Sequence, residues 1–307
     1  MANPSEQNTL HPPTDGGVSL PYEGHLERAR EALPASLPDV AKRVLLALDI
    51  DGTLLGDQQV SSRVRGAVQR ASEAGINVVI ATGRSLPETR PVLEDLRFGS
   101  GFMVSANGAK TVEWERTRDG RSVYHPMREW LFDPVDSVRR VEAVMPGAVF
   151  GIDNGDGPMM VSEEFAPGEL VAGQMITPIG QMVKRPTTRM IVRQSHLSRD
   201  NFATALAQAN LRDVECAVGW TSWADITAKG ATKGRGLRDL AHDLAVPPEG
   251  TIAIGDGEND IQMLRWASHG VAMGNAGAAV KAAADATTGP VSADGAAAVI
   301  EALLERY

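Results

Sequence analysis

The chain of 307 residues is long enough for one large folded core or two cores of ordinary size. Its 30 basic and 39 acidic residues give a net charge of −9, which argues against nucleic acid or an anionic membrane as a partner. The single cysteine, Cys216, excludes an intramolecular disulfide, and no segment reaches the roughly 20 apolar residues that cross a bilayer.

Residues 1–40 are predicted to form a poorly ordered tail. Prolines at positions 4, 12, 13, 21, 34 and 38 interrupt any regular element there. The first residues also lack the basic start and the apolar run of a secretory signal peptide. We therefore expect a cytoplasmic protein and assign no chemistry to the tail.

Residues 41–108 have the pattern of the first half of an α/β core. Val44 to Ile50 is a short, continuous apolar run, as expected for a strand that is buried on both faces. Apolar residues from Val60 to Ala71 recur at helical spacing, and Gly75 ends that helix. The segments 77–83 and 101–108 predict two further buried strands.

Residues 109–228 have a different character. Short segments of alternating apolar and polar residues replace the continuous apolar runs, and several turn signals separate them. This pattern predicts an inserted α+β unit with an antiparallel sheet.

Residues 229–307 return to the first pattern. The segments 251–257 and 270–275 predict buried strands, residues 236–244 predict a helix, and Asp294 is placed to cap a last helix. Strands that alternate with helices indicate a doubly wound, Rossmann-like parallel sheet that is completed across the insert.

Small, polar and acidic residues stand at the ends of four predicted strands, where ligands bind in doubly wound sheets. In chain order, these residues are Asp49, Asp51, Gly52 and Thr53; Thr82, Gly83 and Arg84; Ser105, Asn107 and Gly108; and Gly255, Asp256, Asn259 and Asp260.

The carboxylates at these ends indicate a metal site. Asp49 and Asp51 leave the same face of an extended segment and repel each other unless a cation lies between them. Asp256 and Asp260 add to the repulsion. Mg²⁺ relieves it, because this ion prefers a few carboxylates together with waters and phosphate oxygens. Thr82 adds a hydroxyl hydrogen-bond donor, Arg84 a cation and Lys233 an ammonium. Together with the carboxylates, these groups suit phosphoryl transfer.

Each motif also has a simpler interpretation. DIDGT could be a strand-to-turn junction, GDGEND a solvated turn that caps a helix, and ATGR carries little information by itself. Their occurrence together, in this order and at the ends of separate strands, favours a functional site.

DIDGT, ATGR, SANGA, ATKG and GDGENDIQML together resemble the haloacid dehalogenase (HAD) superfamily, and most closely its Cof-type phosphatases with a class IIB cap. The resemblance covers about residues 43–306. It implies a core formed by residues 41–108 and 229–307, with residues 109–228 as the cap.

The resemblance also implies catalytic and metal-binding roles. Asp49 is the expected nucleophile, which becomes an aspartyl phosphate, and Asp51 the expected general acid and base. Asp49, the main-chain carbonyl of Asp51, and Asp256 are expected to hold Mg²⁺, while Asp260 orients the groups around them.

The remaining matches imply contacts to the substrate. Thr82 and Lys233 resemble the two residues that hold the phosphate, with Gly83 and Arg84 beside them. Asn259 is expected to bind phosphate or a metal-bound water, and Asn107 and Gly108 to meet the substrate below the cap. Lys229, four residues before Lys233, is the alternative for the lysine.

The leading hypothesis is a Mg²⁺-dependent phosphatase acting on a small phosphorylated metabolite, with sugar phosphates the first class. A phosphosugar mutase of the same superfamily is an alternative. It would need cap cations to hold a second phosphate, and candidates are Arg139, Arg140, Arg185, Arg189 and Arg193. A catalytically silent binding or regulatory protein is the third hypothesis. No nucleic acid or membrane partner is expected.

Overall fold

The structure of the protein is a computed structural model. It describes residues 20–56, 59–155, 157–167, 169–170, 172–219 and 221–307.

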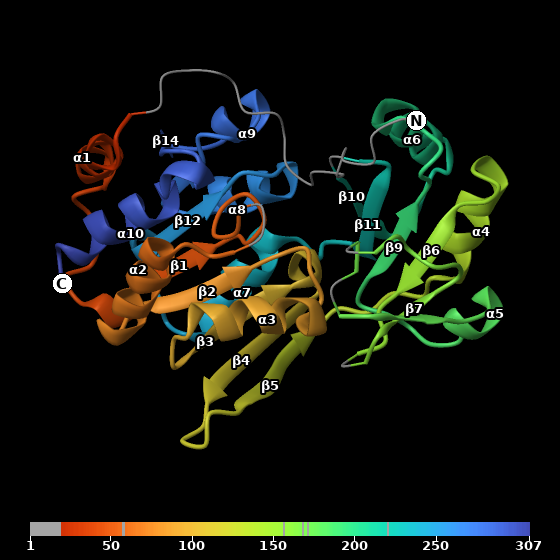
Figure 1. The fold of residues 1–307 in the computed structure, drawn as a ribbon, viewed down its shortest axis with the longest axis horizontal. Coiled ribbons are helices and arrows are strands. Elements are labelled where there is room, and N and C mark those ends of the chain that lie inside the picture. The colour runs from red at the N-terminus through yellow and green to blue at the C-terminus, as the bar shows by residue number, and fades with distance from the viewer. Residues whose placement is uncertain (1–19, 57–58, 156, 168, 171, 220) are drawn as a thin grey trace, which may run out of the picture.

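An eight-stranded sheet, here the first sheet, lies at the centre of one of the two halves of the folded molecule (Figure 1). Its strand order is β14-β13-β12-β1-β2-β3-β4-β5. Its strands are β1 (Leu45–Leu48), β2 (Asn77–Ala81), β3 (Ser100–Ser105), β4 (Lys110–Arg116), β5 (Ser122–Glu129), β12 (Thr251–Gly255), β13 (His269–Ala272) and β14 (Ala286–Thr287). Neighbouring strands from β14 to β3 are parallel, whereas β4 and β5 are added antiparallel. The strand β1 lies between β12 and β2, so it is buried on both edges and both faces.

Helices lie on both sides of this sheet. One side carries α1 (Tyr22–Ala32), α2 (Ser62–Glu73), α3 (Leu86–Leu96) and α10 (Gly295–Leu304); the other carries α7 (Lys233–Asp243), α8 (Ile261–Trp266) and α9 (Ala278–Lys281). The strand β1 serves both cores, because Leu46 and Leu48 belong to one cluster and Leu45 and Ala47 to the other. The predicted doubly wound α/β fold is confirmed.

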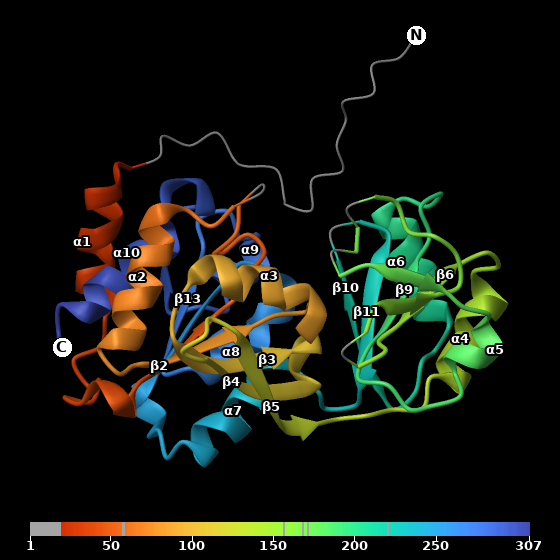
Figure 2. The ribbon, with the colours of Figure 1, turned by 60° about the horizontal axis from the view of Figure 1, so that its bottom comes forward.

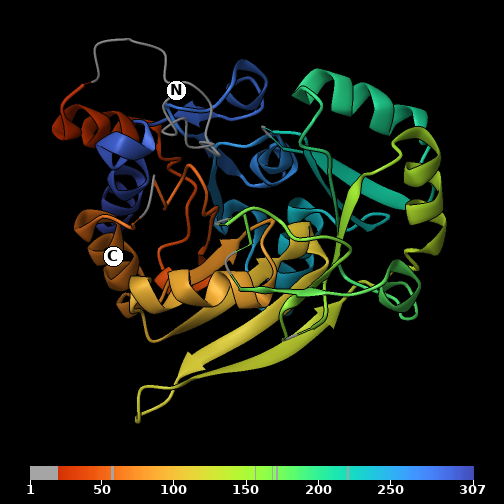
Figure 3. The same ribbon diagram turned by 45° about the vertical axis from the view of Figure 1, so that its right-hand side comes forward.

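The N-terminal prediction needs a correction. Residues 1–19 lie outside the described residues, but Tyr22–Ala32 forms the helix α1 where a poorly ordered tail was predicted. Leu26 and Ala29 are buried, and α1 packs along α10 (Figures 1 and 3). Pro21 and Pro34 lie just outside the helix at its two ends, where they limit it without breaking it.

The predicted boundary at residue 109 also needs a correction. The strands β4 and β5 extend the core sheet rather than belonging to the insert. Val112 and Trp114 are fully buried in the core, and the Trp114 ring packs edge-on against Phe98. Alternation of apolar and polar residues predicts a strand but does not say which sheet the strand joins, which is why this segment was misplaced.

A six-stranded sheet, here the second sheet, belongs to the other half of the folded molecule. Its strand order is β10-β11-β9-β6-β7-β8. Its strands are β6 (Val149–Ile152), β7 (Met159–Val161), β8 (Gln174–Ile176), β9 (Met190–Arg193), β10 (Val214–Val218) and β11 (Trp223–Ala228). The helices α4 (Val135–Val144), α5 (Ile179–Met182) and α6 (Arg199–Gln208) lie on the side away from the first sheet (Figure 2). The other face of this sheet is therefore turned toward the first sheet.

Short 3-10 helices complete the described secondary structure: η1 (Ala41–Arg43), η2 (Ala106–Gly108), η3 (Pro248–Gly250), η4 (Glu258–Asp260) and η5 (Val291–Ala293). Among the helices of the described ranges, none combines the length and the apolar character that a membrane span requires.

Candidate active site

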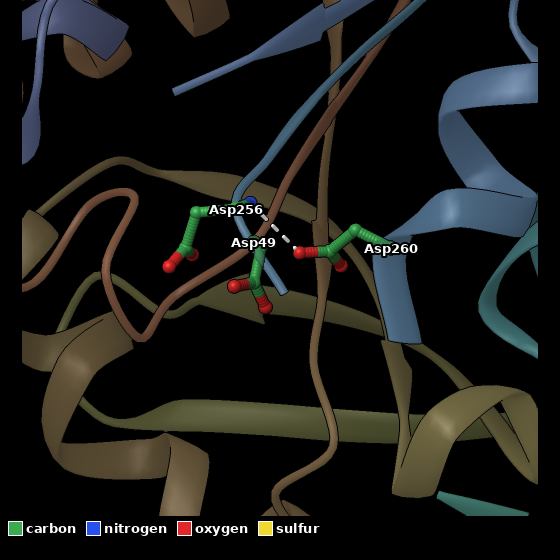
Figure 4. A group of neighbouring side chains, drawn as sticks. All are labelled: Asp49, Asp256 and Asp260. Atoms are coloured by element: carbon green, nitrogen blue, oxygen red, sulfur yellow. Dashed lines mark hydrogen bonds between the residues drawn. The ribbon is translucent and has the colours of Figure 1, made fainter. Parts of the chain in front are cut away.

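Three carboxylates meet at the carboxyl end of the parallel strands (Figure 4). Asp49 follows β1, Asp256 follows β12, and Asp260 ends η4. One oxygen from each lies within 4.8 Å of the others, and all three residues are buried. The predicted convergence of acids from separate strands is therefore present in the fold.

Asp260 anchors the loop that carries Asp256. Its Oδ2 accepts hydrogen bonds from the backbone N–H groups of Asp256 at 2.9 Å and Gly257 at 2.8 Å. Its Oδ1 accepts one from Lys233 Nζ at 2.6 Å. Asp260 thus accepts three hydrogen bonds from the protein, which leaves Asp49 and Asp256, with one and two in the described structure, as the more available carboxylates.

Lys233 links two of the acids. It is the first residue of α7, whose N-cap Thr232 accepts a hydrogen bond from the N–H of Arg235. The fully buried ammonium lies 2.6 Å from Asp49 Oδ1 and 2.6 Å from Asp260 Oδ1. Burial alone would lower the pKa of Lys233, but the two carboxylates raise it above its usual range. Lys229, the alternative, is exposed and pairs with Asp213 at 3.3 Å.

The electrostatics of the acids favour a bound cation. Burial, followed by repulsion from Asp260, raises the pKa of Asp256 to about 7 and that of Asp49 well above its usual value. A divalent cation between them would offset both causes. Buried carboxylate oxygens are hard ligands, so the chemistry of this donor set fits Mg²⁺.

Asp51 lies outside the three-carboxylate group and pairs with Arg84. The guanidinium donates from Nε to Asp51 Oδ2 at 2.9 Å and from Nη2 to Oδ1 at 2.5 Å, a bidentate arrangement. Burial lowers the pKa of Arg84, but the hydrogen bonds and charge of Asp51 outweigh that effect and raise it. The structure thus places both predicted residues at the rim, in contact with each other.

The loops after β2 and β3 bring amide and hydroxyl groups to the same edge. Thr82 is fully buried, and its Oγ1 accepts a hydrogen bond from the N–H of Arg84 at 3.1 Å. Asn107 Oδ1 accepts one from Asn259 Nδ2 at 2.9 Å, while Asn107 Nδ2 is buried with no partner among the described residues. A Cβ added to Gly83 would lie 3.2 Å from Asn107 Oδ1, so these residues are close neighbours.

Gly108 explains how the Asn107 loop meets α7. Its φ is +100°, and a Cβ there would lie 2.1 Å from the carbonyl oxygen of Thr232. Only glycine permits this approach, which brings η2 against the residue that precedes Lys233.

The sequence analysis missed Asn275, which contacts Asp256 Oδ2 and the carbonyl of Gly52. Asn275 follows β13, so the rule applied to the other strand ends would have found it. It also missed the ion pair of Glu88 in α3 with Arg189, which joins the two halves of the molecule. No local signal predicts a contact across 101 positions.

A family model for haloacid dehalogenase-like hydrolases matches residues 46–124 and 176–300. The phosphatase YwpJ of Bacillus subtilis (strain 168) is 29% identical, over 80% of this chain and 94% of that protein. The 5-amino-6-(5-phospho-D-ribitylamino)uracil phosphatase YcsE of the same organism is 28% identical, over 83% and 94%.

A plant protein matches over a smaller share of its length. The chloroplastic endoribonuclease YBEY of Arabidopsis thaliana is 29% identical over 77% of this chain, but this chain spans only 42% of that protein. Its named activity is therefore not assigned to this chain.

Solved structures share the fold. A haloacid dehalogenase-like hydrolase from Bacteroides thetaiotaomicron has a TM-score of 0.70 at 25% identity, covering 85% of this chain and 99% of that chain. The sugar phosphatase BT4131 of HAD subclass IIB has a TM-score of 0.68 at 24% identity, covering 84% and 98%, and this likeness concerns the fold alone.

Proposed function

The chain belongs to the haloacid dehalogenase-like hydrolase family, and from this premise we propose that it hydrolyses phosphomonoesters of small metabolites with Mg²⁺, sugar phosphates being the first class. Its membership of the superfamily, its α/β fold and its place among phosphatase-type hydrolases confirm the corresponding predictions from the sequence. The substrate class and the metal are the proposed part.

The observation that carries the proposal is the buried group of Asp49, Asp256 and Asp260, in which Asp49 and Asp260 bond the Lys233 ammonium. Burying several like charges is costly unless they are paired or hold a metal. Among the described residues, Lys233 is the cation that bonds these acids, and a further cation at Asp49 and Asp256 would complete the charge balance. Together with the main-chain carbonyl of Asp51, these two carboxylates would hold Mg²⁺, which would neutralise charge on the transferred phosphoryl group.

The proposed reaction has two steps. A carboxylate oxygen of Asp49 attacks phosphorus and forms an acyl phosphate, and Asp51 gives its proton to the departing oxygen of the alcohol. Asp51 then takes a proton from water, and the hydroxide so formed attacks phosphorus. This attack releases inorganic phosphate and restores the carboxylate of Asp49. For the donor role Asp51 must exchange its contact with Arg84 for one with the leaving oxygen.

Groups around Asp49 are suited to hold the phosphate oxygens. Thr82 offers a hydroxyl, Lys233 an ammonium, and Asn107 the Nδ2 that lacks a partner in the described structure. We propose that Asn259, which orients Asn107, and the backbone at Gly83 and Gly108 complete this cradle, with Arg84 at its rim.

A mutase is less well supported than a phosphatase, because four of the five candidate cap arginines are paired with carboxylates. Arg189 bonds Glu88 and Asp225, Arg193 bonds Glu169, and Arg139 and Arg140 both bond Asp136. A second phosphate would have to displace these carboxylates. The names of the Bacillus relatives, which include a phosphatase of a phosphoribityl compound, also support hydrolysis of small phosphorylated metabolites.

We propose a revised domain division and keep the predicted compartment. Residues 41–129 and 229–307 would form the core, with α1 attached to it, and residues 130–228 the cap that closes over the substrate.

A cytoplasmic location is proposed on the single cysteine, which suits a reducing environment.

Release of phosphate from a panel of phosphomonoesters tests the proposal. With Mg²⁺ we expect hydrolysis that stops in EDTA and returns when Mg²⁺ is restored. Asp49→Asn should lower kcat by at least about 1,000-fold while the circular dichroism spectrum and melting temperature stay near wild type. Unchanged turnover in this variant would exclude the aspartyl-phosphate route. Isomerisation that depends on a bisphosphate would favour the mutase, and inactivity of folded protein across the panel would favour a silent binding protein.

A further inference from the structure

Asn275 lies in the loop after β13, and its side chain connects three separate segments. Its Nδ2 donates to the carbonyl oxygen of Gly52 at 2.9 Å and to Asp256 Oδ2 at 3.2 Å. Its Oδ1 accepts from the N–H of Val291 at 2.9 Å. A flipped amide would set oxygen against two oxygens and nitrogen against an N–H, so these partners fix the orientation of the amide.

Asp256 is held from two sides as a result. Its Oδ1 accepts a hydrogen bond from Thr53 Oγ1 at 3.1 Å, and its Oδ2 accepts the one from Asn275. Each oxygen therefore has one protein donor, and a carboxylate oxygen can still accept from or bind a second group. The plane of the carboxylate is thus set before any ligand arrives.

The loop of Gly52 is part of the same arrangement. Gly52 has φ +79°, and a Cβ there would lie 2.2 Å from Asp256 Oδ2, so this loop passes directly over the carboxylate. By bonding both the carbonyl of Gly52 and Asp256, Asn275 fixes the distance between the segment that carries Asp49 and Asp51 and the segment that carries Asp256.

We propose that Asn275 is a positioning residue for the metal site, which sets the Asp256 carboxylate and the loop of residues 49–53 in register for Mg²⁺. This inference rests on the proposed function. The side chain keeps no free donor for the ion or the substrate, because its hydrogen-bonding groups serve Gly52, Asp256 and Val291. Residues in this position around a metal typically change its affinity by about 10–100-fold when they are removed.

The chain offers a matched control at the other end of the sheet. Asn77, at the start of β2, is also half-buried, and its Nδ2 also donates two hydrogen bonds, to the carbonyl oxygens of Lys42 and Val44. Asn77→Ala removes a similar set of contacts far from the carboxyl ends of the strands. It therefore reports what the loss of such an amide does to stability alone.

The experiment is a Mg²⁺ titration of metal-free wild type, Asn275→Ala and Asn77→Ala, followed by isothermal titration calorimetry and by the shift of the melting temperature. We expect Asn275→Ala to raise the Kd for Mg²⁺ by about 10–100-fold and Asn77→Ala to leave it within about twofold. At saturating Mg²⁺ the KM of Asn275→Ala should stay within about threefold of wild type. Asn275→Ser, which keeps a polar side chain in the loop, replaces the alanine variant if that variant does not fold.

The outcomes separate this inference from the proposed function. If wild type binds Mg²⁺ and the Asn275 variants bind it equally well, Asn275 is merely structural and the inference is wrong. The inference is also wrong if the Asn77 and Asn275 variants lose affinity for Mg²⁺ to the same extent. If wild type neither binds Mg²⁺ nor hydrolyses phosphomonoesters, the proposed function itself fails, and the inference falls with it.

Discussion

Single residues decide the charge balance of the site, and Lys233 has the largest part in it. Its ammonium is fully buried and contacts Asp49 and Asp260, each at 2.6 Å. Buried ion pairs of this kind contribute little net stability, but removal of one partner leaves uncompensated buried charge. Lys233 thus serves both folding and the orientation of the Asp49 oxygen that is proposed to attack phosphorus.

Replacement of Lys233 by methionine should show both effects. We expect Lys233→Met to lower the free energy of unfolding by about 3–5 kcal/mol, because two buried carboxylates lose their partner, and to lower kcat by about 100-fold or more. Urea unfolding and the phosphatase assay measure the two quantities.

Lys229→Met is the matched control, since Lys229 is exposed and pairs with the exposed Asp213. It should change stability by no more than about 0.5 kcal/mol and leave kcat unchanged. Similar losses in both variants would contradict the specific role of Lys233.

The residue types at strand ends were enough to predict the centre of the site. Asp49, Asp256 and Lys233 meet because parallel strands end at one edge, which follows from the alternation of strands and helices. The pairing of Asp51 with Arg84 could not be predicted, since rotamers depend on packing that a sequence does not specify.

At the level of elements, α1 shows how tertiary contacts override local signals. The helix is bounded by prolines and is amphipathic over few turns, so its sequence alone resembles a tail. Its stability comes from α10, where Tyr22 donates to Glu301 at 2.7 Å and Arg30 pairs with Glu305. The buried His25 packs against Gly289 on the same side.

The docking of α1 should weaken in acid. Burial, and next the charge of Arg28, lower the pKa of His25 below its usual value near 6.5. The folded state thus favours the neutral ring, so this contribution to stability is present above about pH 6.5 and is lost as the pH falls. The buried His269 has its pKa lowered in the same direction, by burial, and adds to the loss.

Urea unfolding between pH 7.5 and 5.5 measures this effect. In His25→Gln the slope of the free energy of unfolding against pH should be shallower than in wild type, by up to about 1.4 kcal/mol per pH unit. His242→Gln, which alters a histidine with an 89% exposed side chain, should follow the wild-type slope. Parallel curves for wild type and His25→Gln would contradict the prediction.

At the level of the whole molecule, a buried ion cluster joins the two sheets. Arg189, just before β9, donates to Glu88 of α3 at 2.6 Å and to Asp225 of β11 at 2.8 Å. Glu88 also accepts hydrogen bonds from the N–H and hydroxyl of Ser85, next to Arg84. Arg199 and Glu258 form a second, more exposed link at 3.3 Å. These contacts join the second sheet and its helix α6 to α3 and η4 of the first half.

Loss of the Arg189 cation should loosen this junction. Arg189→Met leaves Glu88 and Asp225 buried without their cationic partner, and we expect the free energy of unfolding to fall by about 3–5 kcal/mol. Urea unfolding followed by tryptophan fluorescence measures it. Arg140→Met, which removes a partly exposed pair with Asp136, should cost no more than about 1 kcal/mol. An Arg189 variant as stable as the Arg140 variant would show that the cluster does not hold the two halves together.

The general architecture could be predicted, while its boundaries could not. Continuous apolar runs identified the strands of the parallel sheet, because such strands are buried on both faces. The alternating segment of β4 was compatible with either sheet, and its pairing with β3, together with the burial of Trp114 in the first core, places it in the first sheet. Long-range pairs such as Glu88 with Arg189 depend on the final packing and leave no periodic trace.

The position of β1 at the centre of the sheet also matters during synthesis. The strand has β2 on one side and β12 on the other, and Thr53 meets Asp256 across 203 positions of sequence. On the ribosome, Asp49 is synthesised long before β12 has been translated, so at that stage Asp49 lacks its neighbours Asp256 and Asp260. We expect a chain truncated anywhere before β12 to lack hydrolase activity, because such a chain contains neither Asp256 nor Asp260.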